Sequence, residues 1–492
     1  MKQVLFVVDN PDKWPFEVSG VKIVSARKYL TEPQFSDLRN CKIFNLCNSY
    51  RYQSAGYYVS LLAEARGHKP IPSIETIQDM KSQSIVRSIS ADLEETMQKS
   101  LAHIQSDEFS LSIYFSRSIA KCYDSLSRQL FNLFPAPLVK ATFKRNDNVW
   151  ELQNISPISG SEIPAANVSD VVRFAKEYFS GRIQVSSKKM TARFDLAILM
   201  DKDDPTPPSD SKAIQRFVKA AESLEIATEI ISKNDYGRLS EFDALFIRQT
   251  TSVTSHTYRF ARRAEAEGLV VIDDPKSIVR CTNKVFLSEL MEHHEIPIPR
   301  TMIVHKGNSN EVLSKLGLPC ILKQPDSEFS LGVVKAETEE EYKQRISQLL
   351  EKSDLIVAQE FIPTTFDWRI GIVDQKPLYA CKYFMARKHW QIYNHDKQGS
   401  EKLGKVETLP IELVPQRVMK TALKAANLIG NGLYGVDLKV FNKQCYVIEV
   451  NDNPSIDHGI EDDLLRDVLY ERIMEVFLKR MEQKKEARRN YS

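Results

Sequence analysis

The sequence has no long hydrophobic run and no excess of charge of one sign. Its first apolar stretch, VLFVV, ends at Asp9 and is too short for the apolar region of a signal peptide. No apolar run approaches the roughly 20 residues that a membrane-spanning helix requires. Lys plus Arg number 67 and Asp plus Glu 65, so the net charge of +2 favours neither nucleic acid nor an acidic membrane. We therefore expect a soluble, cytoplasmic protein with neither kind of partner.

Cysteine is scarce, and its spacing excludes two common structural roles. The seven cysteines include no CxxC pair and are Cys41, Cys47, Cys122, Cys281, Cys320, Cys381 and Cys445. This pattern is typical of reduced, mostly buried thiols rather than of a disulfide framework or a zinc site. Two phosphate-binding signatures are missing as well, because the chain has neither a GxxxxGK[ST] loop nor a GxGxxG motif after a strand. A nucleotide ligand must therefore be held in another way.

The length of 492 residues indicates three or four domains, and the residue pattern changes near residue 190. Before that point strand-like and helix-like patterns alternate, which predicts an α/β domain over residues 1–188. The expected strands are 4–8, 42–47 and 110–115, the expected helices are 56–66 and 123–134, and a hairpin turns at 146–148. After residue 193 short strands and amphipathic helices alternate more closely, and an amphipathic helix over 464–482 would close the last domain.

The most informative feature is a hairpin made of YGVDLKVF and CYVIEVNDNP. A three-residue loop pairs residue 441 with residue 445, which places Asp437 directly across from Glu449. Strand alternation then puts Asn451 on the same face. A two-residue loop would instead pair Asp437 with Ile448 and separate these side chains.

Two carboxylates and an amide oxygen packed this closely repel one another unless a cation lies among them. Oxygen ligands of this kind suit Mg²⁺ or Mn²⁺, with phosphate oxygens completing the octahedron. An ordinary half-exposed hairpin with polar residues on its wet face explains the same pattern, so the hairpin alone leaves both interpretations open.

Two segments upstream of the hairpin are suited to a nucleotide. Lys323 ends an apolar strand and is followed by a turn that contains Ser and Gly, which is a suitable way to hold phosphate charge. A lysine at a strand end is more often simply solvated. Farther along, QEFI (359–362) can offer backbone groups to an adenine edge, and the carboxylate of Asp367 can accept ribose hydroxyls.

Taken in order, these segments resemble the ATP-grasp superfamily and, within it, the RimK-like carboxylate–amine ligases. The resemblance covers roughly residues 190–482 and depends on the strand lysine, QEFI, DWR, GVDLK and IEVNDNP at family-like spacings. It implies α/β and α+β domains in a multidomain chain: a pre-ATP-grasp domain over 189–290, an ATP-grasp domain over 291–482 with lobes 291–362 and 363–482, and a basic tail over 483–492.

The resemblance also implies a role for individual residues. ATP would contact Lys284, Lys323, Ser327, Ser330, Gly332, Glu360, Phe361, Ile362 and Asp367. Two Mg²⁺ or Mn²⁺ ions bridging the phosphates would be held by Asp437, Glu449 and Asn451. Arg369 and Asn394 would be catalytic and face the γ-phosphate or the acyl group, and Asn453 and Ser455 would lie at the substrate end.

The loop that would cover the phosphates departs from the family's glycine-rich pattern. It reads DSEFSLG, in which Gly332 is the one glycine. Ser327 and Ser330 keep hydrogen-bond donors there, but Phe329 makes the loop bulkier, which bears on turnover more than on the fold. The family's NPG-like motif appears as Asn453-Pro454-Ser455 and bears on substrate choice.

The implied reaction joins a carboxylate to an amine through an acyl phosphate. The expected substrate is an amino acid or a short peptide, with a protein tail as an alternative, and a homo-oligomer is common in the superfamily. Two other functions stay open: an ATP-grasp kinase that phosphorylates an alcohol, and a non-catalytic binding protein that ATP regulates.

Residues 1–188 resemble the extra N-terminal domain attached to some RimK-like proteins, a resemblance that does not settle their role. Within them, SYRYQSAGYY (49–58) follows a strand and opens a helix. Arg51 and the neighbouring hydroxyls near a positive helix end are suited to an anionic or amino-acid-like substrate. Tyrosines packed between domains would explain the same stretch.

Overall fold

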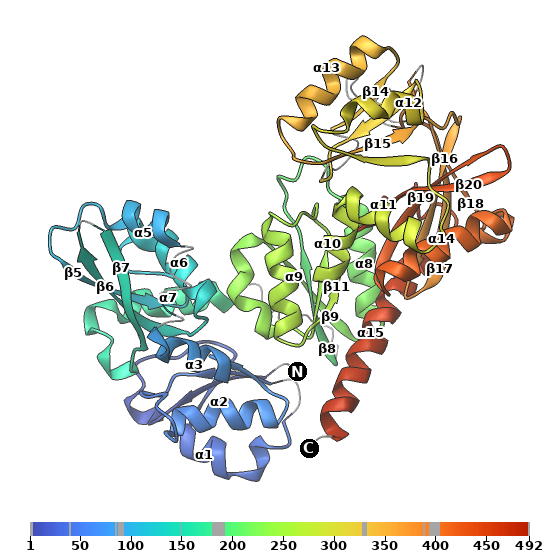
Figure 1. Ribbon diagram of the computed structural model, residues 1–492. Coiled ribbons are helices and arrows are strands. Elements are labelled where there is room, and N and C mark those ends of the chain that lie inside the picture. Colours follow the sequence, from blue (N-terminus) through green and yellow to red (C-terminus); the bar gives the residue numbers. More distant parts are fainter. Residues whose placement is uncertain are drawn as a thin grey trace. The chain divides into compact units, whose positions relative to one another are not determined.

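The computed structural model describes residues 3–38, 41–83, 86, 93–147, 149–179, 192–326, 332–386, 389–392 and 404–490 (Figure 1). The chain divides into two compact units. The first comprises 1–195, 234–243 and 487–492, and the second comprises 196–233 and 244–486. The expected class is confirmed, because α/β and α+β domains follow one another along the chain.

The first unit begins with a parallel sheet in the order β2-β1-β3-β4. Its strands are β1 (Gln3–Val8), β2 (Val21–Ser25), β3 (Cys41–Asn45) and β4 (Lys69–Ile71), and its helices are α1 (Ala26–Thr31), α2 (Ala55–Ala65) and α3 (Ile74–Lys81). β3 and the second half of β1 are buried on both faces because both faces of the sheet are covered. Phe6 and Phe44 pack with Phe115 and Phe179 on one of these faces.

A three-stranded antiparallel sheet in the order β5-β6-β7 completes the first unit. Its strands are β5 (Glu108–Tyr114), β6 (Leu138–Asn146) and β7 (Val149–Pro157), and its helices are α5 (Glu94–Leu101), α6 (Asp124–Leu133) and α7 (Val168–Phe179). The expected hairpin is confirmed, because Asn146 pairs with Val149.

Glu241 is the centre of a buried charge cluster within the first unit. One of its carboxylate oxygens accepts from Lys42 Nζ at 2.7 Å, and the other accepts from Tyr178 Oη at 2.8 Å and Arg238 Nε at 3.2 Å. Glu241 is 0% exposed, so its charge is compensated by these partners rather than by water.

Replacing Glu241 with alanine should therefore lower the free energy of unfolding by about 3–5 kcal/mol, because the buried Lys42 and Arg238 would each lose a carboxylate partner. The measurement is urea denaturation followed by circular dichroism. Glu177→Ala is the control, since that side chain is 43% exposed and its pairs with Arg117 and Arg173 lie at the surface. Equal losses of unfolding free energy in Glu241→Ala and Glu177→Ala would contradict the role of Glu241 as the centre of the buried cluster.

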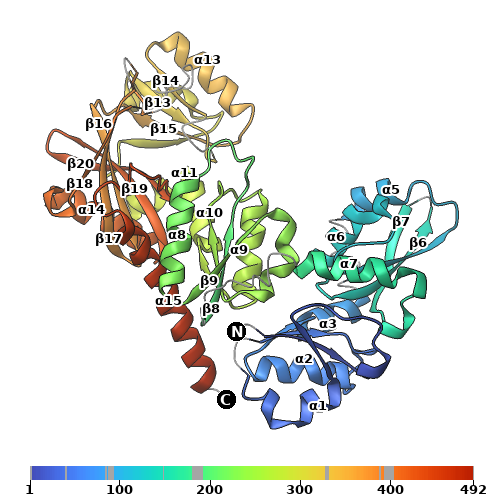
Figure 2. The ribbon, with the colours of Figure 1, turned by 180° about the vertical axis from the view of Figure 1, so that it is seen from behind.

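The second unit opens with the sheet β11-β10-β8-β9, in which β8, β10 and β11 are parallel. The strands are β8 (Phe194–Leu199), β9 (Ile226–Ile231), β10 (Ala244–Ile247) and β11 (Val270–Ile272), and the helices are α8 (Ser211–Ser223), α9 (His256–Ala266) and α10 (Pro275–Thr282). The helix α15 (Asp467–Asn490) lies along α8 (Figure 2), where the rings of Phe217 and Tyr470 are 4.7 Å apart. It begins at Asp467 rather than at residue 464 and continues past 482 into the basic end of the chain.

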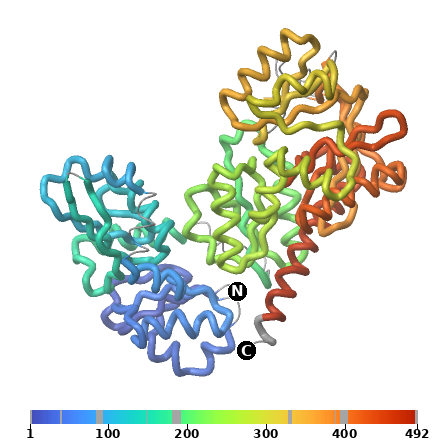
Figure 3. Tube along the Cα trace, in the orientation of Figure 1, coloured from blue at the N-terminus to red at the C-terminus, as the bar shows by residue number. Residues whose placement is uncertain are grey.

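Two antiparallel lobes follow within the second unit. The first has the sheet order β12-β15-β13-β14 and the second β18-β17-β16-β19-β20. The first lobe contains α11 (Lys284–His293), β12 (Thr301–Val304), α12 (Val312–Leu316), β13 (Cys320–Lys323), β14 (Val333–Ala336), α13 (Glu339–Leu350) and β15 (Ile356–Glu360). The second contains β16 (Phe366–Val373), β17 (Lys376–Phe384), β18 (Val406–Leu409), α14 (Gln416–Ile429), β19 (Leu433–Phe441) and β20 (Gln444–Asp452). Figure 3 follows the chain from the first lobe, in yellow, to the second, in orange and red.

The β19–β20 hairpin differs from its expected loop but keeps its expected pairing. Phe441 pairs with Gln444, so the loop has two residues rather than three. Both loop residues, Asn442 and Lys443, have positive φ angles of 47° and 64°, as a type I′ turn requires. The two-residue loop alone would pair Asp437 with Ile448. A register shift between Asp437 and Leu438 makes Ile448 an extra residue, and Asp437 therefore lies opposite Glu449.

Candidate active site

A cavity of about 230 Å³ is lined by both lobes of the second unit. The four-stranded lobe contributes Lys323 from β13 and Glu360 from β15, and the five-stranded lobe contributes Arg369 from β16 and Asp437 from β19. Alternation along β16 explains this side of the cavity. Asp367 and Arg369 face it, whereas Trp368 and Ile370 pack in the core that contains α14.

Each carboxylate on this face is paired with a basic side chain. Asp437 accepts from Arg369 Nε and Nη2, both at 2.7 Å, and also from Asn451 Nδ2 at 3.1 Å. Glu449 lies 3.1 Å from Lys284 Nζ. Burial acts to raise the pKa of Glu449, but Lys284 and the nearby Lys323 outweigh it and hold that pKa below its usual value. Glu449 is thus held in the charged form.

Lys323 ends β13 and is 9% exposed, so its ammonium group has little access to water. Burial, only partly offset by the charge of Glu449, lowers the pKa of Lys323 to about 8. Lys284 is also buried. Its backbone N–H donates to Pro325 O at 2.9 Å, just before the segment that the resemblance assigns to the phosphates. Two desolvated ammonium groups aimed at one cavity are suited to a phosphate chain.

The residues present fit a magnesium site of the kind that a nucleotide completes. Asp437, Glu449 and Asn451 offer hard oxygen ligands on one sheet face. Among the described residues, no three His, Cys, Asp or Glu side chains gather as a metal site. Two carboxylates and one amide are too few ligands for a closed protein site. Mg²⁺ usually keeps waters and binds substrate phosphates as well, so this donor set is suited to it.

Asp367 belongs to a third ion pair, which sequence reasoning missed. Its Oδ1 accepts from Lys439 Nζ at 2.6 Å and from Thr364 Oγ1 at 3.1 Å. Burial raises the pKa of Asp367, and the charge of Lys439 opposes that shift. Lys439 lines the cavity two residues after Asp437 on the same strand. Strand alternation was the signal that could have identified it.

Aromatic side chains line the part of the cavity that the resemblance assigns to adenine. Phe361 and Trp390 lie edge to face with ring centroids 6.2 Å apart, and Lys335 Nζ is 4.7 Å from the Phe361 centroid. Ile362 lines the same region. The carboxylate of Glu360 is engaged by Arg300 Nε at 2.7 Å, so this side chain is held at the lobe surface. Trp390, Lys335 and Arg300 were not predicted from the sequence.

Asn453 lines the cavity and is also hydrogen-bonded to buried groups outside it. Its Oδ1 accepts from Arg248 Nη1 at 2.7 Å, and its Nδ2 donates to Gln249 O at 2.6 Å. Arg248 is 1% exposed and also donates to Pro208 O and Pro454 O. The sequence did not reveal this arginine, because two of its partners, Asn453 and Pro454, lie more than 200 residues farther along the chain.

Hydroxyl groups and one carboxylate gather at the end of the cavity that the resemblance assigns to the substrate. Ser455 lines it together with Thr250, Thr251 and Asp452, and Thr251 Oγ1 donates to Asp452 Oδ2 at 2.7 Å. Gly435 lets the turn after β20 approach β19, because a Cβ atom there would lie 2.8 Å from Pro454 Cβ.

Some expected site residues are outside the described part of the chain, and Gly332 and Arg51 do not line the cavity. Ser327, Ser330, Phe329 and Asn394 are outside the described residues. Gly332 has a φ of 78°, and its carbonyl oxygen accepts a hydrogen bond from Gln324 N at 3.1 Å. This bond joins the two ends of the segment that the resemblance assigns to the phosphates. Arg51 is exposed in the first unit, whereas the cavity is lined by residues of the second.

The two lobes enclose buried lysines, an arginine and a pair of carboxylates, which follow one another in this order along the chain. This arrangement defines an ATP-grasp protein. Residues 281–473 match the RimK-like ATP-grasp domain, and residues 26–173 match the RimK-like ATPgrasp N-terminal domain. Together the two matches span more than half of the chain. The chain belongs to the RimK-like ATP-grasp family, which is a family of carboxylate–amine ligases that use ATP and Mg²⁺.

Similar proteins cover about half of the chain. A probable alpha-L-glutamate ligase of Vibrio vulnificus is 28% identical over 260 residues, which are 51% of this chain and 83% of that protein. A protein of the same description from Stutzerimonas stutzeri is 28% identical over 234 residues, covering 47% and 74% of the two chains. The crystal structure of a RimK domain ATP-grasp protein from Sphaerobacter thermophilus is 13% identical, with a TM-score of 0.45 over 57% of this chain and 98% of that one.

No helix in the described part of the chain combines the length and the apolar character needed to cross a membrane.

Proposed function

We propose that this protein uses ATP and Mg²⁺ to join the carboxylate of one substrate to the amine of another through an acyl phosphate. The observation that carries the proposal is the shared face of β16, β19 and β20, where Asp437 and Glu449 lie opposite each other beside Arg369 and the two buried lysines Lys284 and Lys323. A site that bound ATP without a metal ion would have no use for both carboxylates.

The chain's own residues would bind and orient the reactants. Lys284 and Lys323 would hold the phosphate chain, because each carries its charge into a poorly hydrated cavity. Phe361 and Trp390 would lie against the adenine. Asp367 would accept hydrogen bonds from the ribose hydroxyls. Arg369 would face the γ-phosphate with its planar fork of donors.

Mg²⁺, held by Asp437, Glu449 and Asn451 as two ions, would neutralise charge on the phosphates. The carboxylate oxygen attacks the γ-phosphorus and ADP leaves. The amine then attacks the acyl carbon, and phosphate leaves with the carboxylate's former oxygen. A carboxylate is a poor electrophile because hydroxide is a poor leaving group, and phosphorylation removes that obstacle. Positioning and charge neutralisation are therefore the main tasks of the protein.

L-Glutamate is the first substrate that we propose, as an amino acid ligated to another amino acid or to a peptide. The support is the description of relatives that are 28% identical as probable alpha-L-glutamate ligases. The substrate end is also compatible with an amino acid. Thr250, Thr251 and Ser455 offer hydroxyl groups there, and Asp452 offers a negative charge to an ammonium group.

The test is to incubate the protein with Mg·ATP, L-glutamate and a pool of short peptides that end in glutamate. ADP, free phosphate and peptides heavier by one glutamate residue are expected, and mass spectrometry with a phosphate assay measures them. D-Glutamate is the matched control substrate. A stable phosphorylated product would instead indicate a kinase, and Mg·ATP binding without turnover on any pool would indicate a regulatory site.

A further inference from the structure

The guanidinium group of Arg369 is held on two sides. Asp437 accepts two of its hydrogen bonds, as described above. On another side its Cζ lies 5.0 Å from the ring centroid of Tyr383. Tyr383 is on β17 and 3% exposed, and it pairs with Asp367 across the β16–β17 ladder, so its ring shares the cavity face of the sheet with Arg369.

The hydroxyl of Tyr383 is held in turn by a buried acid. It donates to Glu461 Oε1, and the other oxygen of Glu461 accepts from Asp457 N at 2.7 Å. Glu461 is 1% exposed, and burial raises its pKa to about 7 in spite of these two donors. No ion pair to Glu461 occurs among the described residues. Burying a carboxylate without a cation costs free energy, and packing alone does not explain it.

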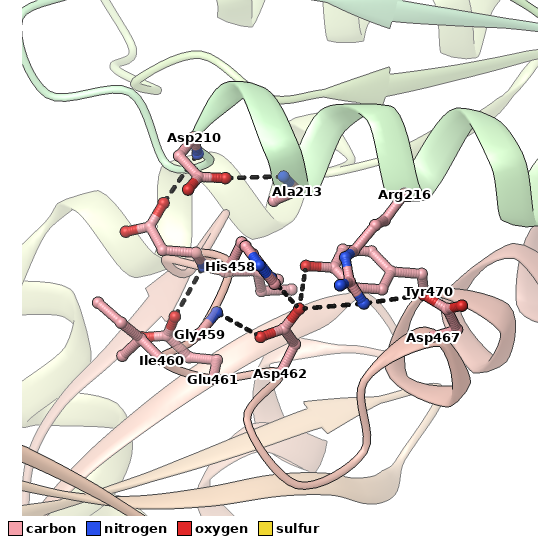
Figure 4. A network of polar contacts seen from close by, with 12 residues as sticks. Asp210, Ala213, Arg216, His458, Gly459, Ile460, Glu461, Asp462, Asp467 and Tyr470 are labelled. Carbon is pink, nitrogen blue, oxygen red and sulfur yellow. Dashed lines mark hydrogen bonds and ion pairs between the residues drawn. The ribbon is translucent and has the colours of Figure 1, made fainter.

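The segment that carries Glu461 is fixed independently of that carboxylate. Figure 4 shows the neighbouring Asp462, which accepts from Gly459 N at 2.6 Å, His458 Nδ1 at 3.1 Å and Tyr470 Oη at 3.0 Å. Thr408 Oγ1 of β18 also donates to Ile460 O at 2.7 Å. Adjacent acids thus have different neighbours: Asp462 ties its segment to α15, whereas Glu461 reaches the tyrosine under Arg369.

We propose that Glu461 and Tyr383 are positioning residues, which hold the guanidinium plane of Arg369 in the orientation that receives the γ-phosphate. Glu461 fixes the Tyr383 hydroxyl, and the ring of Tyr383 fixes one side of the arginine. This inference depends on the proposed function, because it takes Arg369 as a γ-phosphate contact.

The experiment compares the binding of Mg·AMPPNP and Mg·ADP by titration calorimetry, because only AMPPNP carries a γ-phosphoryl group. In Glu461→Gln and in Tyr383→Phe, the preference for AMPPNP over ADP should fall by about tenfold, the usual effect of losing a hydrogen bond to a charged group. The affinity for ADP should stay unchanged. Tyr470→Phe is the matched control, since it removes an equally buried tyrosine–carboxylate bond and leaves Asp462 its bonds from Gly459 N and His458 Nδ1.

A preference that is unchanged in folded Tyr383→Phe and Glu461→Gln would overturn the inference alone, and so would an equal fall in these two variants and in Tyr470→Phe. If one of the first two variants does not fold, the other decides. Failure of the unaltered protein to bind either nucleotide would overturn the proposed function and this inference together.

Discussion

Replacing Glu449 with glutamine is expected to lower ADP formation in the presence of substrate by about a thousandfold or more, on the scale seen when a charge partner of a transferring phosphoryl group is removed. Glutamine keeps the shape of the side chain but cannot neutralise a cation. In this site the change also leaves Lys284 and Lys323 without their nearest carboxylate, because Glu449 lies 3.1 Å from Lys284 Nζ. The measurement is a coupled assay for ADP across a range of Mg²⁺ concentrations.

The matched control for this prediction is Glu407→Gln on β18 of the same sheet. The Glu407 side chain is 44% exposed, and it pairs with Lys382 at 3.9 Å outside the cavity lining. Its loss should leave the rate within about twofold, because a surface ion pair contributes little. A Glu449→Gln enzyme that is folded and keeps wild-type turnover would contradict the assignment of β20 to the metal site.

Replacing Arg369 with lysine is expected to lower the rate by about a thousandfold while ADP affinity changes little, because the arginine acts on the γ-phosphoryl group. Lysine keeps the charge but cannot form the two parallel hydrogen bonds that Arg369 makes with Asp437 at 2.7 Å. Steady-state rates and ADP binding by calorimetry measure the two effects separately.

Arg417→Lys serves as the control for Arg369. Arg417 lies on α14 and donates to Lys443 O at 3.0 Å in the β19–β20 loop, so its loss perturbs the same hairpin away from the cavity. Similar rates for the two variants, or a loss of ADP affinity that matches the loss of rate in Arg369→Lys, would show that the arginine does not act on the γ-phosphate.

Local patterns predicted individual strands and helices such as β1, β5 and α6, because each depends on residues close together in the chain. The β19–β20 hairpin shows where such reasoning reaches its limit. The pairing of Asp437 with Glu449 was predicted correctly through a wrong loop length. The actual loop is shorter, and the bulge at Ile448 restores the register. A bulge depends on how the strand packs against its neighbours, so alternation along one strand does not reveal it.

The candidate site was predicted unevenly for the same reason. Motif residues such as Asp437, Glu449 and Lys323 were placed in one cavity, as expected from their order in the chain. Arg248, Tyr383 and Glu461 were missed, because what sets them apart is burial beside residues distant in sequence. No local pattern distinguishes a buried arginine or glutamate from a solvated one. The roles proposed for Arg51 and Asn394 remain predictions.

The central claim is that the substrate carboxylate is phosphorylated, and transfer of an oxygen isotope tests it most directly. A substrate labelled with ¹⁸O in its carboxylate should be turned over with Mg·ATP and the amine, and the released phosphate analysed by mass spectrometry. The account predicts that each phosphate carries one ¹⁸O from the carboxylate, in step with amide formation. Phosphate without the label would mean that water attacks ATP directly, and the proposed ligase reaction would then be wrong.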